Sequence, residues 1–539
     1  MLSYEYTIKL DEIVSVFAES GILMASRCFL EGKMNTIKKN KKAVGLFFFG
    51  LAVFLIMLAY FTRLHALVLF DTDDWKYASY SRQAVPLWKN WNPTRVFPEI
   101  FMSLCYDFAS AVFYPVSKDY LGAGTFMTAL VVSVAVCVYL VTFVRLLRVR
   151  FQVEDSLSLG AGALFFLMHF WIFRSALTGN QHMFYSFDIC CYYYYIIPNL
   201  LNCTLVMLAI IHFSPEKLVQ EAGTGKRAIL VLLMYLALFS NLYASIIFAV
   251  YLGWHLLGNL LCWIRGRKKN SGKPCAFRFW LRQNSVSLIC LCLWAVVQIF
   301  EANGGRADSL KKNEGYLLLV RDTLKNAWAL KGQVNRIFLL FCGLTVLLFL
   351  VMAAVKRREQ GTRICEYKKF CLNNLVVSVI IFIYLVLICS KHYSEAIQRA
   401  DILFGTLFFL LLSVVLLFCY VVTSIPQLKV LVPLFLVMVF YQINPSAQVV
   451  FRDSNIVGWT DQQCRYTTQK IIDQIIQADQ NQQDSVVLTI PKFNDGDNWP
   501  ITAGACGQIS QTLRKQGVIS HDINIEETNV IDIAQFREY

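Results

Sequence analysis

The chain has 539 residues, of which 57% are hydrophobic, and its mean hydropathy is +0.50. A soluble protein of this length does not reach these values, and apolar runs of about 18 or more residues recur along the chain, which is typical of membrane-spanning helices. The formal net charge of +14 does not indicate binding to nucleic acid, because the basic residues cluster in short segments between the apolar runs, where they orient the chain in a membrane.

We predict an all-α polytopic membrane protein, because helices satisfy their own backbone hydrogen bonds in lipid. Residues 1–42 are expected to form a cytoplasmic segment without an obvious cleavable signal peptide. Residues 1–33 either precede the natural start, for which Met34 is better suited than Met1, or lie along the membrane surface. The membrane domain, residues 43–443, is expected to hold about eleven spans. The expected spans are residues 43–70, 123–144, 157–173, 192–213, 228–243, 245–263, 285–300, 335–355, 372–390, 402–423 and 429–443.

The charge pattern orients these spans. Lysines at positions 38, 39, 41 and 42 precede the first apolar run, which places the start of the chain inside. The inner loops 145–156, 264–284 and 356–371 are then the most basic short loops, and they also attract anionic lipid. Ser240-Asn241 is expected to form a tight turn, since one continuous helix would place the basic residues 265–269 outside. An odd number of spans leaves the C-terminus outside.

The outer segments are residues 71–122, 174–191, 301–334, 391–401 and 444–539. In the first outer loop, 71–122, interleaved apolar and polar residues predict helices that lie along the outer surface. The outer tail, 444–539, is expected to be a small α/β region, with a helix at residues 467–478 and a buried strand at 485–490 that Pro491 ends. Cys464 and Cys506 share this tail, so a disulfide between them is left open.

An acidic cluster, Asp71-Thr72-Asp73-Asp74, stands directly after the first span. Carboxylates at a membrane border are costly unless they are used, paired or hydrated. Asp71-Thr72-Asp73 matches a D-x-D pattern that holds a divalent metal in enzymes using nucleotide sugars. Such a metal is not favoured here, because nucleotide sugars are not normally available outside, and a general base that deprotonates a hydroxyl group fits the compartment better. One of the three aspartates is expected to cap the helix that follows.

A tryptophan and a second polar motif follow the acidic cluster, so that the chain reads Asp73-Asp74-Trp75 and then Trp88 and Trp91-Asn92-Pro93-Thr94-Arg95. Together with the many spans, these short motifs resemble the GT-C superfamily of integral membrane glycosyltransferases. The similarity is to bacterial glucosyltransferases that modify surface polysaccharides, although Pro93-Thr94 stands where related families more often have a single glycine. The motifs cover residues 71–95 only.

The resemblance implies that a sugar, such as glucose, moves from a polyprenyl-phosphate donor to a cell-surface glycan or lipid-linked acceptor. The reaction would take place at the outer face of the bacterial cytoplasmic membrane and invert the anomeric centre, with no cofactor required. An aspartate would act as the general base, in the order Asp73, Asp74 and Asp71. The resemblance also places Trp75, Trp88, Asn92 and Arg95 near the substrates.

A lipid-phosphate leaving group requires cationic hydrogen-bond donors. The candidates are basic residues of the outer segments, Arg306, Arg399, Lys391 and Arg174, with arginine preferred as a bidentate ligand. Each of them can instead snorkel at a span end. His182 and Glu301 are candidate substrate contacts, and the tyrosines at 192–195 are interpreted as an aromatic belt. No motif with metal-ligand spacing supports a metal site at His182.

Two other functions remain open. A polysaccharide polymerase or ligase is also polytopic and has arginine-rich outer loops, but it needs no acidic cluster in its first loop. A transporter or flippase usually has charges or broken helices near the bilayer midplane and often internal symmetry. The predicted spans are nearly free of charge and the sequence shows no repeat between its halves, which favours chemistry at the membrane surface.

Overall fold

The computed structural model describes residues 41–80, 91–173, 182–269, 277–303, 315–443, 459–493 and 496–538. Helices form nearly all of the regular structure in these ranges, and one two-stranded sheet is the exception. Ten of the described helical segments are long and apolar enough to cross a membrane. The chain is therefore an all-α protein with the helices of a multi-pass membrane protein, as its hydropathy predicts.

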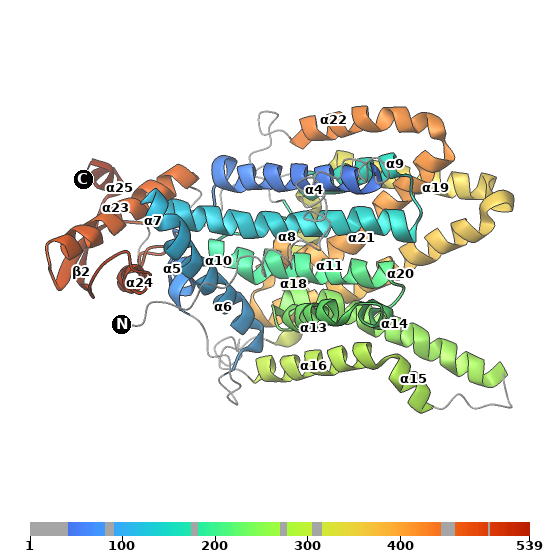
Figure 1. Cartoon of the computed structure of the whole chain (residues 1–539), viewed down its shortest axis with the longest axis horizontal. Helices are drawn as coiled ribbons and strands as arrows, with labels where there is room; N and C mark the ends of the chain where they lie inside the picture. The colour runs from blue at the N-terminus through green and yellow to red at the C-terminus, as the bar shows by residue number, and fades with distance from the viewer. Residues whose placement is uncertain are drawn as a thin grey trace.

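Long helices make up the bundle. The first half of the chain contributes α4 (Lys41–Ala59), which the π-helical turn η1 (Tyr60–Leu64) extends, α8 (Tyr120–Arg150), α9 (Asp155–Trp171), α11 (Ile197–Ile211) and α13 (Thr224–Leu238). The second half contributes α14 (Leu242–Lys269), α16 (Ser285–Ala302), α18 (Tyr316–Ala329), α19 (Arg336–Val355), α20 (Arg357–His392), α21 (Ala400–Ser424) and α22 (Val432–Ile443). Three of them, α4, α8 and α11, run side by side along the long axis of the molecule (Figure 1).

Shorter elements connect these helices. They are α12 (Pro215–Gln220), α15 (Phe277–Gln283), η4 (Leu330–Gly332), η5 (Ser394–Gln398) and η6 (Pro426–Leu431). The expected turn at Ser240-Asn241 is confirmed, because α13 ends at Leu238 and α14 begins at Leu242. The Asn241 side chain stabilises this turn by accepting a hydrogen bond from the Tyr243 amide at 2.8 Å.

The lengths of several helical segments differ from the prediction. The helices at two expected spans, α9 and α13, have 17 and 15 residues, which lie at or just below the short end of the roughly 17–25 residues that cross the hydrocarbon core. In contrast, the segment Pro93–Ser117, expected to lie along the outer surface, has 25 residues and is apolar enough to span. This segment comprises α6 (Pro93–Phe108), η2 (Ala109–Phe113) and α7 (Tyr114–Ser117). By length and composition the described residues therefore hold ten candidate spans, which include Pro93–Ser117 but not the shorter α9 and α13. Both ends of Pro93–Ser117 lie at the end of the bundle that carries α5 and the C-terminal region, since Arg95 bonds to Tyr77 and Asp119 pairs with Arg465, so this segment does not reverse the orientation of the chain.

The expected loop at residues 356–371 is also wrong, because α20 begins at Arg357 and has 36 residues. The helix has a kink at Gln360, where φ and ψ leave the helical region. At a rise of 1.5 Å per residue the part after the kink, residues 361–392, is about 48 Å long, and the hydrocarbon core is only about 30 Å thick. Basic residues do not end a helix, so a charged stretch can continue it beyond the apolar part. The first span is shorter than expected, since its helical segment ends at Leu64 and buried, non-helical residues 67–70 follow.

The centre of the bundle consists of α8, α11 and α21. In their most apolar stretches 61%, 83% and 78% of the residues are buried, compared with 17% in α16 and in the segment Pro426–Ile443. Close packing at the centre depends on a small residue, because a Cβ atom added at Gly405 of α21 would lie 2.4 Å from Ile247 Cγ1 of α14.

The C-terminal region is a separate α/β unit at one end of the bundle, beside α5 and α7 (Figure 1). It consists of α23 (Asp461–Gln480), β1 (Ser485–Pro491), α24 (Ala503–Lys515), β2 (Asn524–Ile531) and α25 (Ile533–Glu538). The two strands are parallel, and α24 lies between them in the chain. The predicted tail helix and strand are thus confirmed. Cys464 and Cys506 are both buried, and no disulfide joins them.

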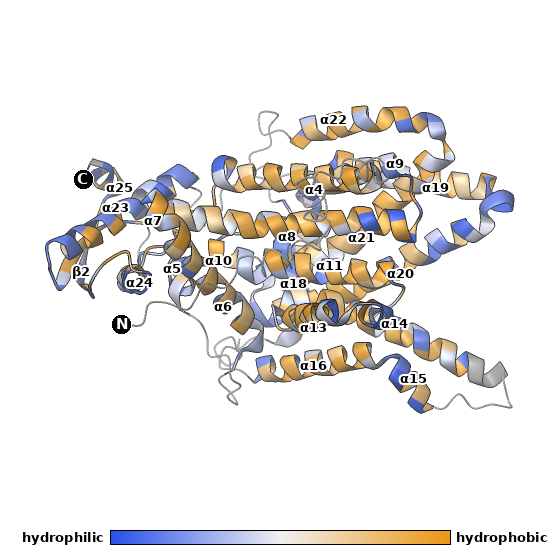
Figure 2. Cartoon of the chain, viewed as in Figure 1, coloured by the Kyte–Doolittle hydropathy of each residue, from blue (hydrophilic) through white to orange (hydrophobic). Residues whose placement is uncertain are grey.

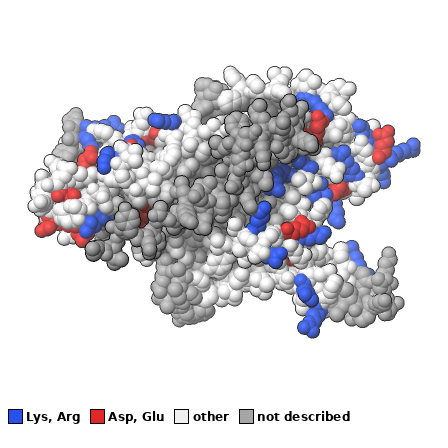
Figure 3. Space-filling view, viewed as in Figure 1, with Lys and Arg blue, Asp and Glu red and all other residues white. Residues whose placement is uncertain are grey.

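Hydropathy and charge vary along the long axis of the molecule. Figure 2 shows apolar residues along the helices of the bundle and polar residues towards both ends. Figure 3 shows lysine and arginine side chains gathered over the end opposite the C-terminal region. That end holds the turns after α8 and after α19, where the basic segments 145–150 and 356–358 lie.

We expect Gly405→Ala to destabilise the protein, since overpacking a tight helix contact costs roughly 1–3 kcal/mol. Gly343→Ala in α19 is the matched control, because an added Cβ atom there meets nothing within 4 Å, and alanine favours a helix over glycine. Thermal melting of the purified variants in detergent measures both effects. An unchanged melting temperature for Gly405→Ala would contradict the close approach of α14 and α21.

Candidate functional site

The acidic cluster lies on the short helix α5 (Thr72–Ser79), which begins after Asp71. Asp71 Oδ1 accepts a hydrogen bond from the Asp73 amide at 2.9 Å, so Asp71 is the N-cap residue. The prediction that one of the three aspartates caps this helix is confirmed. Asp71 is nevertheless only 2% exposed, and its second oxygen, Oδ2, has no hydrogen-bond partner among the described residues.

Asp74 points from α5 into the bundle. It is 1% exposed, and its Oδ1 atom accepts a hydrogen bond from the Cys190 amide at 2.7 Å. Cys190 belongs to α10 (Ile189–Cys191), which continues through η3 (Tyr192–Ile196) into α11. Asp188 immediately precedes α10 and adds a third carboxylate, whose Oδ1 atom is buried without a hydrogen-bond partner in the described part of the chain. Asp73 is partly exposed and is the α5 aspartate that solvent reaches most readily.

Burial dominates the electrostatics of this cluster. It raises the pKa of Asp71 and of Asp74 far above the ordinary value of 3.8, and the negative charge of Asp188 raises both further. Burial also raises the pKa of Asp188, whereas the positive charge of Arg399 lowers it. A low dielectric penalises each negative charge, and neighbouring carboxylates repel one another. The cluster therefore keeps protons at a pH where isolated aspartates have lost them.

Arg399 supplies the positive charge beside the cluster. Its Nε atom donates to Asp401 Oδ1 at 3.0 Å and its Nη2 atom donates to Oδ2 at 2.7 Å, which is a bidentate pair. Ser186 Oγ donates to the same Oδ2 atom at 2.6 Å. The guanidinium carbon lies 4.9 Å from the ring centroid of Phe187 and 4.6 Å from that of Tyr195. The guanidinium is thus held rigidly, and its Nη1 group takes no part in the pair with Asp401.

A second polar cluster connects α6 with α5 and η3. Arg95 Nη1 donates to the Tyr77 hydroxyl at 3.3 Å and lies 4.0 Å from Glu99 Oε1, while the Tyr194 ring centroid lies 5.2 Å from the guanidinium carbon. The Tyr194 hydroxyl donates to Glu99 Oε1 at 2.5 Å, and Glu99 is fully buried. The interpretation of residues 192–195 as an aromatic belt is therefore wrong, because the first three of these tyrosines are buried inside the protein.

Two of the predicted substrate contacts, Trp75 and Glu301, hold the structure around α5 and α6 together, whereas the side chain of a third, Asn92, makes no capping hydrogen bond. Trp75 is 1% exposed, and its indole stacks on the Tyr120 ring. Asn92 is buried at the N-cap position of α6. Glu301, at the end of α16, accepts hydrogen bonds through Oε1 from the amide and the hydroxyl of Thr94, at 2.8 and 2.7 Å. Glu301 thereby caps α6 and ties it to α16.

The other predicted residues lie elsewhere. His182 is buried between η1 and α9, where its Nε2 atom lies 3.0 Å from the Tyr60 hydroxyl and its ring stacks on Phe170. Lys391 is exposed, and its Nζ atom lies 5.7 Å from the ring centroid of Tyr316. Three further predicted residues lie outside the described residues: Trp88, Arg174 and Arg306.

The structure thus joins the aspartates of α5 to Arg399 through Asp188, which the sequence interpretation did not assign to the site. A feature of the sequence could have identified Asp188. This acidic residue stands directly before an apolar run, just as the cluster at residues 71–74 stands directly after one, and both positions are at a membrane border. Asp401 was also missed, although it follows Arg399 by two residues at the start of a span. Glu99 has no such signal, since an acid inside an amphipathic helix usually faces water.

One group among the described residues has the spacing of metal ligands. Asp188, Cys190 and Cys191 each place a ligand atom within 4.8 Å of the others. Two thiols and a carboxylate suit zinc better than magnesium, and the aspartates of the D-x-D pattern do not belong to this group. Arg399 Nη2 lies 3.8 Å from Cys191 Sγ, so a permanent positive charge already stands beside the thiols and opposes a metal cation.

The C-terminal region holds the beginning of α5. The amide and the hydroxyl of Thr72 both donate to the Pro500 carbonyl, at 2.9 and 2.5 Å. The Thr502 amide donates in turn to Thr72 Oγ1 at 3.4 Å. Because Thr72 stands between Asp71 and Asp73, these bonds fix the backbone that carries both carboxylates.

The end of α5 is held by α24 and the residue that follows it. The last carbonyl groups of a helix have no partner within the helix. Here Lys515 Nζ donates to the Ser79 carbonyl at 2.6 Å, and Gln516 Nε2 donates to the Ala78 carbonyl at 3.0 Å. The Thr512 hydroxyl donates to Ser79 Oγ at 2.8 Å. A helix of eight residues is marginal in water on its own, so α5 depends on the C-terminal region on one side and on α10 on the other.

Comparisons of the chain with protein-family models, with curated proteins and with solved structures found no match. The chemistry of the site is therefore inferred from its own geometry.

We expect Thr72→Val to speed hydrogen exchange in α5. The variant keeps the shape of the side chain but removes a hydrogen bond worth about 1 kcal/mol, which is roughly a fivefold change in an opening equilibrium. Deuterium uptake of peptides covering residues 71–80, measured by mass spectrometry, tests this. Thr72→Ser should restore slow exchange. Thr468→Val is the control, since the Thr468 hydroxyl bonds within α23. Slow exchange in Thr72→Val would show that the C-terminal region does not hold α5.

We expect wild-type protein to lose stability relative to Asp74→Asn as the pH rises. The pKa of Asp74 is raised in the folded state, so its contribution to stability is fully present below the ordinary pKa and is lost as the pH rises through the folded pKa. Asparagine keeps the oxygen that accepts the Cys190 amide but carries no charge. Melting temperatures between about pH 5 and pH 8 should therefore diverge. Asp322→Asn, an exposed change in α18, should parallel wild type, and parallel curves for Asp74→Asn would contradict a buried charge.

Proposed function

We propose that this protein is an integral membrane glycosyltransferase of the GT-C type, which transfers a sugar from a polyprenyl-phosphate donor to a hydroxyl group of a glycan or glycolipid. The observation that supports this most directly is the buried aspartate cluster at the end of the bundle that the C-terminal region covers. Buried carboxylates with a raised pKa are candidates for acid–base chemistry. The proposal places the protein in the bacterial cytoplasmic membrane, with its start inside and its C-terminal region outside.

Asp73 is the residue we assign as general base. A base must reach the proton that it accepts, and Asp73 is partly exposed, whereas Asp71 and Asp74 are buried. The two buried aspartates tend to keep their protons because burial raises the pKa of each. The two buried aspartates therefore add little negative charge next to Asp73. Asp74 also fixes α5 by accepting the hydrogen bond from the Cys190 amide.

The proposed reaction needs neither a nucleotide nor a metal ion, because the acceptor, the lipid-linked donor and one aspartate account for every bond and proton. The acceptor hydroxyl gives its proton to Asp73 while its oxygen bonds to the anomeric carbon of the sugar. The bond between that carbon and the phosphate oxygen breaks, and polyprenyl phosphate leaves with the electron pair. The anomeric centre passes through a transition state with oxocarbenium character. Attack from the side opposite the phosphate inverts it.

The departing phosphate requires a positive charge, and Arg399 is the favoured group. Its ion pair with Asp401 and its two flanking rings hold the guanidinium in place, so little side-chain entropy is lost when a phosphate binds. The Nη1 group remains to donate to the phosphate. Lys391, near the end of α20, is the second candidate because it is exposed, and the short segment 392–398, which contains η5, separates it from Arg399 along the chain.

Purified protein is expected to transfer a sugar from a polyprenyl-phosphate hexose to a glycan acceptor. Asp73→Asn should lower kcat by about 10²- to 10⁴-fold, which is the usual contribution of a general base. Asp74→Asn should retain more activity, because its amide oxygen still accepts the hydrogen bond from Cys190. Mass spectrometry of the glycosylated product, with a panel of hexose donors, measures the transfer.

The exposed change Asp322→Asn is the control and should retain full activity. Melting temperatures of all variants separate a loss of chemistry from a loss of folding. Full activity in both Asp73→Asn and Asp74→Asn would remove the general base from this pair. Folded wild-type protein that transfers no hexose from any polyprenyl-phosphate donor would contradict the proposed donor class.

A further inference from the structure

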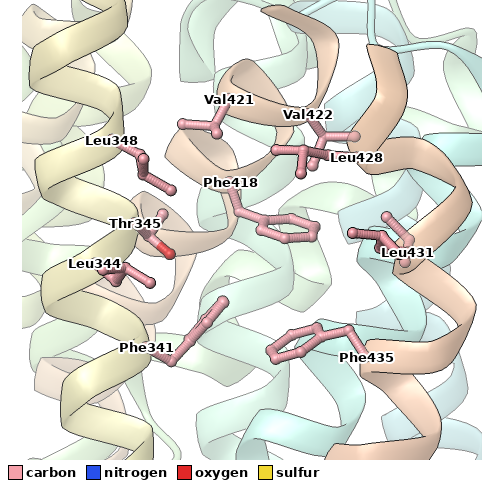
Figure 4. Close-up of a pocket in the computed structure, with 11 residues that line it drawn as sticks. Phe341, Leu344, Thr345, Leu348, Phe418, Val421, Val422, Leu428, Leu431 and Phe435 are labelled. Carbon is pink, nitrogen blue, oxygen red and sulfur yellow. The ribbon is translucent and has the colours of Figure 1, made fainter. Parts of the chain in front are cut away.

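A partly open apolar groove lies between α19 and the segment formed by η6 and α22, with α21 as its floor (Figure 4). Leu344 and Leu348 of α19 face Leu431 and Phe435 across the groove, and the Phe418 ring lies between these walls. The volume of the groove is about 190 Å³. An apolar cavity of roughly 150 Å³ in another protein admits a benzene molecule, so this groove has room for several carbon atoms of a chain.

The chemistry of the groove fits a hydrocarbon. Among the described residues that line it, Thr345 alone carries a polar side-chain atom. The two walls and the floor of the groove all belong to segments that are long and apolar enough to cross a membrane: Arg336–Val355, Pro426–Ile443 and Ala400–Ser424. An apolar cavity does not retain water, and the medium beside these segments in a membrane is lipid. The occupant that suits the groove is therefore a lipid chain.

Basic side chains stand at one end of the groove. Lys356 directly follows α19, and its Nζ atom donates to the Ser424 carbonyl at the end of α21, at 2.9 Å. Lys429 lies on η6, between two residues that line the groove, and its ammonium group pairs with Glu154. An ammonium group has three donors, so one partner leaves others for a ligand. Two exposed arginines, at positions 357 and 358, follow Lys356.

We propose that the groove binds one acyl chain of an anionic glycerophospholipid, and that Lys356 and Lys429 hold the phosphate of its headgroup. Basic residues at a membrane border attract anionic headgroups, each contributing about 1 kcal/mol. A zwitterionic headgroup brings its own ammonium group next to the two lysines and is disfavoured. This lipid site is independent of the proposed sugar transfer.

The bound lipid has a structural role in this proposal. The segment Pro426–Ile443 is only 17% buried in its most apolar stretch, and α22 is held to α9 in part by a hydrogen bond from Trp171 Nε1 to Gln442 Oε1 at 2.8 Å. Phe341 of α19 stacks on Phe435 of α22, with ring centroids 5.0 Å apart. A lipid chain that fills the groove extends this contact between the two helices along their length.

Native mass spectrometry of protein taken from nanodiscs tests the chain site. The nanodiscs contain equal amounts of phosphatidylglycerol and phosphatidylethanolamine with identical acyl chains. Wild-type protein is expected to retain one phosphatidylglycerol molecule, and Leu344→Trp is expected to lose it. Leu344 is 52% exposed at the edge of the groove, so an indole fills the space without opening the core. Leu347→Trp is the matched control, since Leu347 is 56% exposed on the same helix but does not line the groove.

A second pair of variants tests the headgroup site. Lys429→Gln should lower the ratio of retained phosphatidylglycerol to phosphatidylethanolamine at least severalfold, whereas Lys368→Gln, an exposed change on α20, should leave the ratio unchanged. Equal retention of both lipids by wild type, or full retention in Leu344→Trp, would overturn the proposal. Displacement of phosphatidylglycerol by an equal amount of polyprenyl phosphate would also overturn it and assign the groove to an isoprenoid lipid.

Discussion

The hydrogen bond from the Cys190 amide to Asp74 joins α5 to the membrane bundle, and the two bonds from Thr72 to the Pro500 carbonyl join the same helix to the C-terminal region. An eight-residue helix does not hold its shape alone in water. The positions of the α5 carboxylates therefore depend on both the membrane bundle and the C-terminal region, because α5 lies between them and bonds to each. The membrane helices determine which carboxylate is buried, and the C-terminal region determines where the helix begins.

Ion pairing does not neutralise all of the negative charge of the carboxylates around α5. Arg399 is paired in a bidentate manner with Asp401, and that pair nearly cancels its own charge. The neighbouring carboxylates of Asp71, Asp74 and Asp188 then share a region of low dielectric with little positive charge to spare. Bound protons relieve most of this repulsion, because the neutral carboxyl group loses little on burial. The site is thus built to store protons close to a carboxylate that reaches the surface.

Most of the helices could be predicted from the sequence, but few of the side-chain contacts between helices could. Hydropathy located the apolar helices, and the polar pair Ser240-Asn241 marked the turn between α13 and α14. The short apolar run before Pro491 located β1. Helix ends were less accurate, because the charged residues between positions 363 and 369 continue α20 after its kink at Gln360. Local pattern also identified a capping aspartate in α5. The hydrogen bonds that Asp74, Asp401 and Glu99 accept from Cys190, Ser186 and Tyr194 join positions 116, 215 and 95 residues apart. No local pattern encodes such pairings. The tyrosines after Asp188 looked like interfacial residues because their buried partner Glu99 lies on a different helix.

The candidate site draws on four distant parts of the chain: residues 71–74, 188–191, 399–401 and 500–516. A ribosome delivers these parts in order, so the first carboxylates leave the translocation machinery long before the residues that hold α5 exist. During synthesis α5 has neither its bundle partner nor its cap, and its carboxylates are hydrated and ionised like those of any short peptide. The arrangement of α5 is complete only when α10 has packed against it and residues 500–516 hold both of its ends. A chain that lacks the C-terminal region is therefore expected to reach the membrane with the beginning and the end of α5 unsupported.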